Sequence, residues 1–225
     1  LVVTRPDEPA GRKQILTPTP VKLWAEVHNI PVLTPAKLDA EFISTLNAKR
    51  YTLGILAAYG KIVPDPVLSS FTKGILNIHP SLLPKYRGPT PVQSAILSGD
   101  KTTGVSIMLL DSEMDHGDIV ASAKILIPNS ITKIELDAIL WRQGGQMLAD
   151  VIPKWVAGEI KSTEQDHGQA TYTKKFTNED AFIKPETLGL GSEASKLEVN
   201  YAMRQVRALN PEPGTFTRLN LRNQI

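Results

Sequence analysis

The chain of 225 residues contains no cysteine and only 6% aromatic residues. The absence of cysteine excludes disulfides, thiolate nucleophiles and cysteine-ligated zinc sites, and it agrees with a reducing compartment, so we expect a cytoplasmic location. The sequence also lacks an apolar run of the roughly 18 residues that a membrane-spanning helix needs, and it does not begin with the layout of a signal peptide. We therefore expect no membrane partner.

Neither sign of charge dominates. The 25 basic and 23 acidic side chains give a net charge of +2 at neutral pH, so the protein has no strong overall field that would attract nucleic acid. Any contact with RNA must therefore be local. The hydrophobic share of 41%, together with 15 glycines, is that of a globular protein with one large domain and a smaller appendage.

Short apolar runs alternate with amphipathic segments along the chain. A first helix is expected to end near Asn29, and further helical patterns cover residues 36–48, 64–70, 90–98 and 131–156. Strand-length apolar runs lie between them, at residues 30–33, 52–57, 74–78, 104–110 and 117–127. This alternation predicts an α/β fold with a Rossmann-like, doubly wound and mostly parallel sheet.

The long helical pattern divides the chain into a main domain and a remainder. It closes the main domain, residues 1–158, although Gly144-Gly145 is a weak point in the helix and Pro153 predicts a kink. Residues 159–177 are polar and are expected to form a linker. Residues 178–225 hold one more helix, at about 193–209, and are too few for a good independent core.

Two polar side chains mark the carboxyl end of the strand at residues 74–78. Strand alternation sends Asn77 and His79 to one face of the sheet, and in open α/β sheets the carboxyl ends of strands border the ligand crevice. A proline-rich apolar loop follows at residues 81–89. A histidine at a strand end is often purely structural, so both interpretations stay open at this point.

The strand at residues 104–110 is followed by four carboxylates and a histidine: Asp111, Glu113, Asp115, His116 and Asp118. One interpretation is a solvated acidic loop. A second is a metal site of His79, Asp115, His116 and Asp118, but no helical histidine pair or compact ligand spacing supports it. A third is acid/base chemistry, because a carboxylate orients an imidazole and an asparagine amide can donate to an oxyanion. The third, without a metal, suits acyl transfer to an amine.

The sequence Asn-Ile-His-Pro-Ser-Leu-Leu-Pro-Lys-Tyr-Arg-Gly at residues 77–88, followed by Asp115, closely resembles the folate-dependent formyltransferases. These enzymes carry a trio of Asn, His and Asp and a Ser-Leu-Leu-Pro loop. Residues 5–12 with 16–22, 58–64 and 207–214 resemble the branch of the family that acts on methionyl-tRNA. The resemblance covers nearly the whole chain.

The resemblance implies that Asn77, His79 and Asp115 are catalytic. It implies 10-formyltetrahydrofolate as the formyl donor, with tetrahydrofolate as product. It also implies initiator methionyl-tRNA as the acceptor, for translation initiation. Separately, we expect a monomer. Arg12 and Lys13 would contact the tRNA. The cofactor site would be lined by Lys61, Ile62, Val63, Ser81, Leu82, Leu83 and Pro84.

The resemblance also sets expectations about the two ends of the chain. Members of the family open with a strand, a Gly-Thr-Pro turn and a helix that this sequence does not contain. They continue into a β-barrel RNA-binding domain, of which residues 178–225 would be the beginning. We therefore expect the sequence to be part of a longer protein.

Two other functions remain open from the sequence. The first keeps the chemistry and changes the acceptor to an amino sugar on a nucleotide, but such enzymes should lack the segment at residues 5–22. The second is a non-catalytic fragment that binds folate or RNA. Retention of Asn77, His79 and Asp115 together argues against the second.

Arg12 lies in a segment, residues 5–16, that contains two prolines and a glycine without periodicity and is expected to form an exposed loop. An arginine there can pair bidentately with phosphate or a base edge. We predict that Arg12→Ala weakens the use of methionyl-tRNA strongly, by about tenfold or more, while folate affinity is nearly unchanged. Steady-state kinetics with the tRNA and a folate-binding titration measure the two effects. Unchanged formylation of the tRNA would contradict the prediction.

Overall fold

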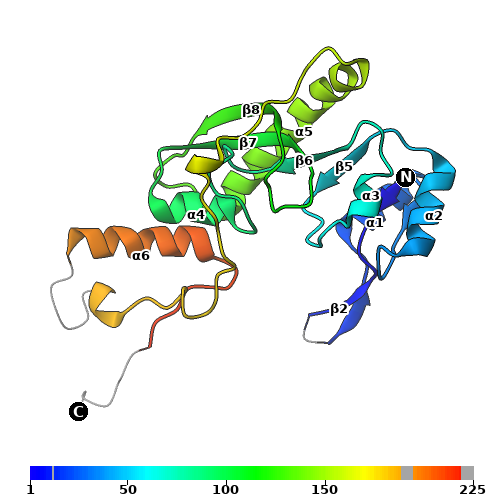
Figure 1. Cartoon of the computed structure of the whole chain (residues 1–225). Helices are drawn as coiled ribbons and strands as arrows, with labels where there is room; N and C mark the ends of the chain where they lie inside the picture. Colours follow the sequence, from blue (N-terminus) through cyan, green and yellow to red (C-terminus); the bar gives the residue numbers. More distant parts are fainter. Residues whose placement is uncertain (12, 189–194, 219–225) are drawn as a thin grey trace. The chain divides into compact units, whose positions relative to one another are not determined.

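A computed structural model describes residues 1–11, 13–188 and 195–218. The chain forms two compact units, Leu1–Ile75 and Leu76–Ile225, and each is described by itself (Figure 1). Strands and helices alternate along both units, which confirms the α/β class. The part of the chain that is described contains no helix that is long and apolar enough to cross a membrane.

The first unit is built around a small apolar core. Strand β1 (Val2–Val3) pairs in parallel with β4 (Val32–Leu33), and the unit also contains β5 (Gly54–Ala57), α1 (Pro20–Val27), α2 (Ala40–Lys49) and α3 (Asp65–Leu68). Helix α1 begins at Pro20, because proline suits the first helical turn and the Thr19 hydroxyl accepts from the Lys22 amide. The core side chains Phe42, Leu46 and Val67 come from α2 and α3.

Residues 5–16 contain a β-hairpin, so the expectation of a loop is wrong. Strand β2 (Glu8–Ala10) pairs antiparallel with β3 (Ile15–Thr17), and Pro9 lies opposite Leu16. All six strand residues are exposed, which is why the sequence shows no alternation of polar and apolar side chains. Arg12 lies outside the described residues.

The second unit contains three strands in antiparallel order: β6 (Ile75–His79), β7 (Thr102–Leu109) and β8 (Ile119–Leu126). The sequence locates all three, but the expectation of parallel pairing is wrong for them. An apolar run indicates that a strand is buried and carries no information about its direction. Helix α4 (Pro91–Ser98) lies between β6 and β7 in the chain.

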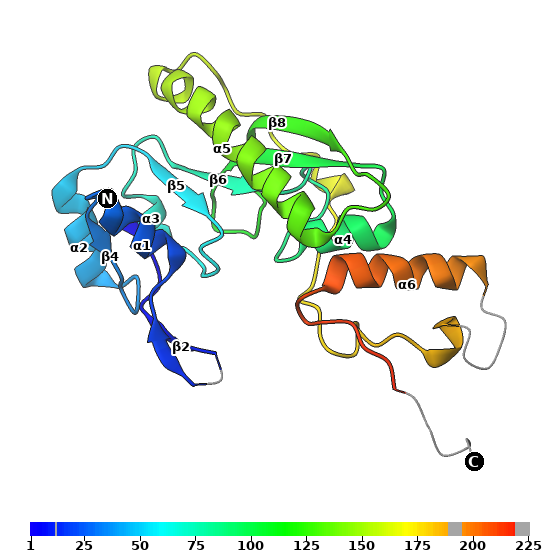
Figure 2. The same ribbon diagram turned by 180° about the vertical axis from the view of Figure 1, so that it is seen from behind.

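Helix α5 (Lys133–Ala157) packs against β7 and β8, and α6 (Lys196–Leu209) packs against α4 (Figure 2). A capping box of Thr132 and Glu135 starts α5, and Gly158, at φ +76°, ends it. Pro153 lies inside α5 and does not end it. Helix α6 is found where expected, although its predicted first residues lie outside the described part.

Residues 159–177 contain a short 3₁₀ turn, η1 (His167–Gln169), between irregular segments, and η2 (Pro185–Leu188) follows them. The two compact units divide at Ile75, inside the segment that the sequence assigns to one catalytic domain. The domain boundaries at residues 158 and 177 stay predictions.

The glycine pair of α5 has two different environments. A Cβ on Gly144 would lie 2.7 Å from Ile78 Cγ2 and 3.0 Å from Val105 Cγ2, so this glycine lets the helix approach β6 and β7 closely. A Cβ on the exposed Gly145 would meet no atom within 4 Å. Only the first glycine is therefore required by packing.

We predict opposite effects for alanine at these neighbouring positions. Gly145→Ala should raise the free energy of unfolding by about 1 kcal/mol, because alanine favours the helix. Gly144→Ala should lower it by about 1–3 kcal/mol, because the new methyl group overpacks the contact with the sheet. Urea unfolding followed by circular dichroism measures both, and a stabilising Gly144→Ala would contradict the packing described here.

Candidate active site

Strand β6 presents two buried polar side chains on one face. Asn77 and His79 are each 5% exposed, and they are two residues apart, so they point to the same side of the sheet. Their partners across the antiparallel pair are Met108 and Ser106 of β7. Both residues lie in β6, as the sequence predicts, so they share one face of this strand.

His79 has an acceptor at each ring nitrogen. Its Nε2 lies 2.9 Å from the backbone oxygen of Tyr86, and its Nδ1 lies 3.5 Å from Asp115 Oδ1. A carbonyl oxygen can only accept, so Nε2 carries a hydrogen and donates it to Tyr86. In the neutral imidazole, the lone pair of Nδ1 therefore faces Asp115.

This arrangement leaves two proton acceptors face to face in a nearly dry place. The side chains of His79 and Asp115 are only 6% and 14% exposed. Two acceptors cannot bond to each other, so a hydrogen bond between Nδ1 and Oδ1 requires a hydrogen on one of these atoms. The pair thus holds an imidazole nitrogen beside a carboxylate in a buried position, an arrangement that suits acid/base chemistry.

Asp115 is held by an unusual backbone and a close amide. Its φ of +50° lies in the left-handed region, which aspartate tolerates better than most residues. Its Oδ2 accepts from the Gly88 amide at 2.7 Å, which leaves Oδ1 toward His79. Gly88 itself has φ +106°, and a Cβ there would lie 2.8 Å from Thr173 Oγ1, so the position requires glycine.

Within the described part of the chain, the side-chain amide of Asn77 has no hydrogen-bond partner in the protein. Buried amides are normally paired, because an unpaired polar group loses its hydrogen bonds to water. The amide next to His79 is therefore available to a ligand. Its NH₂ group can donate to an oxygen that becomes negatively charged during a reaction.

Hydrogen bonds of buried groups hold the Ser-Leu-Leu-Pro loop at residues 81–84. Ser81 is fully buried, and its hydroxyl donates to the Lys85 backbone oxygen at 2.6 Å. Ser106 of β7 donates to the Ser81 backbone oxygen and accepts from the Leu83 amide. Leu82 and Pro84 are partly exposed, whereas Leu83 is buried. The buried side chains of the loop thus fix its shape, and its more open positions remain for a ligand.

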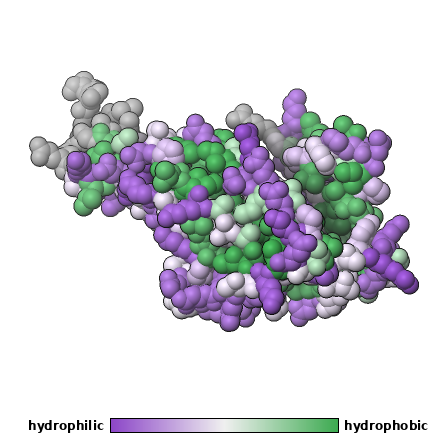
Figure 3. Space-filling view, turned by 90° about the horizontal axis from the view of Figure 1, so that it is seen from above, coloured by the Kyte–Doolittle hydropathy of each residue, from purple (hydrophilic) through white to green (hydrophobic). Residues whose placement is uncertain are grey.

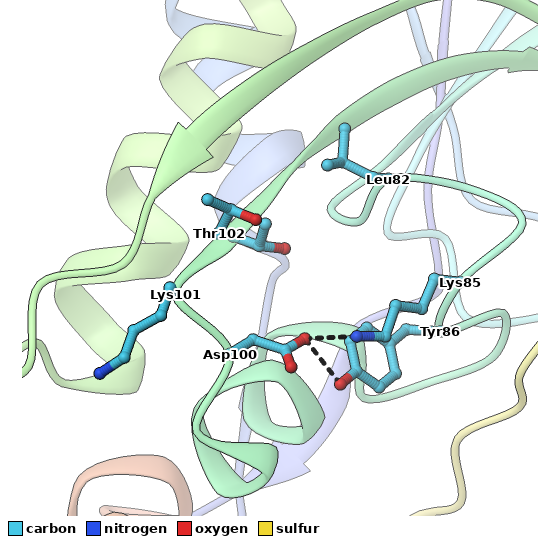
Figure 4. A pocket seen from close by; sticks show the side chains of 7 residues that line it. Leu82, Lys85, Tyr86, Asp100, Lys101 and Thr102 are labelled. Carbon is cyan, nitrogen blue, oxygen red and sulfur yellow. Dashed lines mark hydrogen bonds and ion pairs between the residues drawn. The ribbon is translucent and has the colours of Figure 1, made fainter.

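A pocket of about 170 Å³ is lined by Leu82, Lys85 and Tyr86 and by residues 100–103 (Figure 4). Lys85 Nζ and the Tyr86 hydroxyl both donate to Asp100 Oδ2, at 2.7 and 2.8 Å. The hydrogen bond with Asp100 raises the pKa of Lys85, and burial raises the pKa of the Tyr86 hydroxyl. Tyr86 therefore supports the site with its backbone and faces the pocket with its side chain.

The other predicted cofactor residues belong to the first unit. Ile62 is 90% exposed, Val63 packs against the core of α2 and α3, and Lys61 Nζ donates to the Ala36 backbone oxygen at 3.4 Å. Lys13, predicted to contact tRNA, is exposed next to the hairpin strand β3. Arg12, also predicted to contact tRNA, lies outside the described residues.

The loop at residues 111–118 has its own contacts. His116 Nδ1 lies 2.7 Å from Asp111 Oδ2, and the His116 ring stacks on His167 with centroids 4.1 Å apart. Asp118 accepts from the Ser162 hydroxyl. Among the described residues, no three His, Asp or Glu side chains converge as ligands of one metal ion.

Sequence reasoning missed the groups that hold the catalytic candidates. The Tyr86 carbonyl and the Gly88 amide are backbone groups, and no side-chain pattern identifies them. Arg87, only 1% exposed, and Gln165, 4% exposed, form a buried network beside Asp115. Gln165 lies in the polar stretch expected to be a linker, where its burial has no signal in the composition.

The sequence of this chain is similar to those of known proteins. The family model described as formyl transferase matches residues 1–152. The methionyl-tRNA formyltransferase of Chloroflexus aurantiacus is 46% identical over 217 residues, which cover 96% of this chain and 67% of that protein. The chain thus spans about two thirds of that relative's length.

Solved structures share the fold at lower identity. A 4-N formyltransferase from Francisella tularensis is 20% identical with a TM-score of 0.69, over 88% of this chain and 76% of that one. HypX from Aquifex aeolicus, solved in complex with tetrahydrofolic acid, is 19% identical with a TM-score of 0.63, over 88% of this chain and 33% of that one. Both confirm the fold class.

Proposed function

Because the chain belongs to the formyl transferase family, we propose that it transfers a formyl group to the amino group of methionyl-tRNA. The relative from Chloroflexus aurantiacus, 46% identical, supports this acceptor. The observation that carries the chemistry is the buried pair of His79 and Asp115, 3.5 Å apart, beside the amide of Asn77, which has no hydrogen-bond partner among the described residues.

The proposed donor is 10-formyltetrahydrofolate. The HypX structure with tetrahydrofolic acid supports a folate-type donor, since that protein shares the fold. In our proposal, the open positions of the loop at residues 81–84 and the exposed Ile62 contact the folate, together with Lys61 and Val63. Arg12 and Lys13 would contact the tRNA.

The proposed reaction begins when the amino nitrogen of the acceptor attacks the formyl carbon. A carbon–nitrogen bond forms, the carbonyl electrons move to oxygen, and a tetrahedral intermediate results. The Asn77 amide donates to this oxygen and stabilises its negative charge. The bond to the folate nitrogen then breaks, and that nitrogen receives the proton that the pair of His79 and Asp115 removes from the attacking amine.

The attacking nitrogen must lose a proton before the intermediate can collapse forward. The pair of His79 and Asp115 accepts it, since the Tyr86 carbonyl keeps the other ring nitrogen protonated and turned away. The bound proton lies between Nδ1 and Oδ1 and relieves the repulsion of the two acceptors. Burial of both side chains keeps bulk water from competing for this proton.

We expect His79→Ala to reduce formyl transfer by roughly 10²–10⁴-fold, the usual range for a positioned acid/base group. The measurement is single-turnover transfer from a labelled formyl donor to methionyl-tRNA. His28→Ala is the matched control, because His28 is exposed at the end of α1 and should leave the rate unchanged. Near-normal turnover of a folded His79→Ala variant would show that His79 is not catalytic.

The same assay tests the acceptor. Faster formylation of a nucleotide-linked amino sugar than of methionyl-tRNA would replace the proposed acceptor with that sugar. No transfer to either acceptor would favour a non-catalytic fragment.

Asp115→Asn should remove most of the activity at every pH from about 6 to about 9, while folate binding persists. Asparagine tolerates the same left-handed backbone and can still accept from the Gly88 amide, but it lacks the charge that attracts a proton. Glu113→Gln, in the same acidic loop and exposed, is the control and should leave the rate unchanged. Equal effects of both variants would mean that Asp115 is merely part of a solvated loop.

A further inference from the structure

Gln165 joins the loop of Asp115 to the loop that follows β6. Its Nε2 donates to the backbone oxygens of Asp115 and Gly117, at 3.0 and 2.7 Å. Its Oε1 accepts from Arg87 Nε and Nη2, at 3.2 and 2.8 Å. Both amide hydrogens and both oxygen lone pairs are thus used, and the side chain is only 4% exposed.

The two carbonyls that Gln165 holds belong to a residue with a left-handed backbone, Asp115, and to Gly117 beyond it. Asp115 has φ +50°, so the loop needs outside contacts to keep this conformation. One bond fixes the carbonyl of Asp115 itself, and the other fixes that of Gly117, two residues on. Together they hold the backbone from which the Asp115 carboxylate projects.

Arg87 connects Gln165 to the opposite side of the catalytic pair. The guanidinium also donates to His167 Nδ1 at 2.8 Å, and the Arg87 amide donates to the Thr171 backbone oxygen. Its neighbours in sequence are Tyr86, whose carbonyl accepts from His79, and Gly88, whose amide donates to Asp115. The Gln165 side chain therefore bonds both to the loop of Asp115 and to Arg87, which lies between the two residues that bond to His79 and Asp115.

We propose that Gln165 is a positioning residue for the formyl transfer reaction, acting through Asp115. This inference rests on the proposed function only for its effect on rate. Gln165 keeps Asp115 Oδ1 opposite the unprotonated nitrogen of His79, and it contacts no substrate itself. A purely structural role would instead affect stability and leave the turnover of the folded enzyme unchanged.

The substitution Gln165→Glu removes the hydrogen bonds that Gln165 donates and keeps those that it accepts. A carboxylate still accepts from Arg87, but it cannot donate to the carbonyls of Asp115 and Gly117 and repels them. We expect kcat to fall by about ten- to a hundredfold, the scale of a misplaced reactive group, with KM for the formyl donor within about twofold. Gln169→Glu, an exposed glutamine in η1, is the matched control and should retain the kcat of the unaltered protein.

A double-mutant cycle decides whether Gln165 acts through Asp115. If it does, Gln165→Glu in the Asp115→Asn background should reduce kcat no further, within about twofold. An additive loss would overturn the proposal, because it would mean that Gln165 contributes independently of Asp115. An unchanged kcat in a folded Gln165→Glu variant would overturn it as well.

Hydrogen–deuterium exchange tests the brace without any substrate. In Gln165→Glu, backbone amides of residues 111–118 should exchange about tenfold or more faster, because two hydrogen bonds to that loop are lost. If Gln165→Glu does not fold, Gln165→Asn, which is uncharged and too short to reach both loops, takes its place. Unaltered exchange in the folded variant would overturn the proposal even if the protein proved inactive toward every acceptor, so the two failures can be distinguished.

Discussion

The site depends on the hydrogen bond from His79 Nε2 to the Tyr86 carbonyl. This bond decides which nitrogen of the ring is protonated, and it thereby turns the free lone pair toward Asp115. The bonds that fasten the loop at residues 81–88, including that of the Ser81 hydroxyl, are useful because they keep this carbonyl in place. If the loop moved, Nε2 would lose its acceptor, and the imidazole would no longer be held with Nδ1 toward Asp115.

Local patterns in the sequence predict the strand part of the site well. Alternation along β6 places Asn77 and His79 together, since side chains two residues apart share a face. Asp115 comes from a loop after β7; the residues alone leave its pairing with His79 as one of three interpretations, and the resemblance to the formyltransferases favours it. The sequence does not predict the hairpin of β2 and β3 or the antiparallel order of β6 to β8, and the reasons are related. An exposed two-stranded ribbon has no apolar face that a sequence pattern could reveal. An apolar run of residues does not indicate whether its strand is parallel or antiparallel to its neighbours.

The predicted cofactor residues are of two kinds: some are buried and form hydrogen bonds within the protein, and others are exposed. The Ser81 hydroxyl is buried and donates within its own loop, so it supports the loop from inside. Ile62, in contrast, is almost fully exposed and makes no contribution to the core of its unit. A motif identifies which residues belong to a site, but burial and hydrogen bonding determine which of them shape it and which are open to a ligand.

The segment at residues 159–177 shows how little composition reveals about an inward-facing polar side chain. A guanidinium with 1% exposure would be costly if it were unpaired. Gln165, His167 and the Tyr172 hydroxyl all pair with Arg87, and these partners come from one short polar stretch. Apolar residues could fill the same volume, but they could not hold the carbonyl of Asp115 in a left-handed turn. The buried polar network is therefore better explained by the orientation it imposes than by any stability it adds.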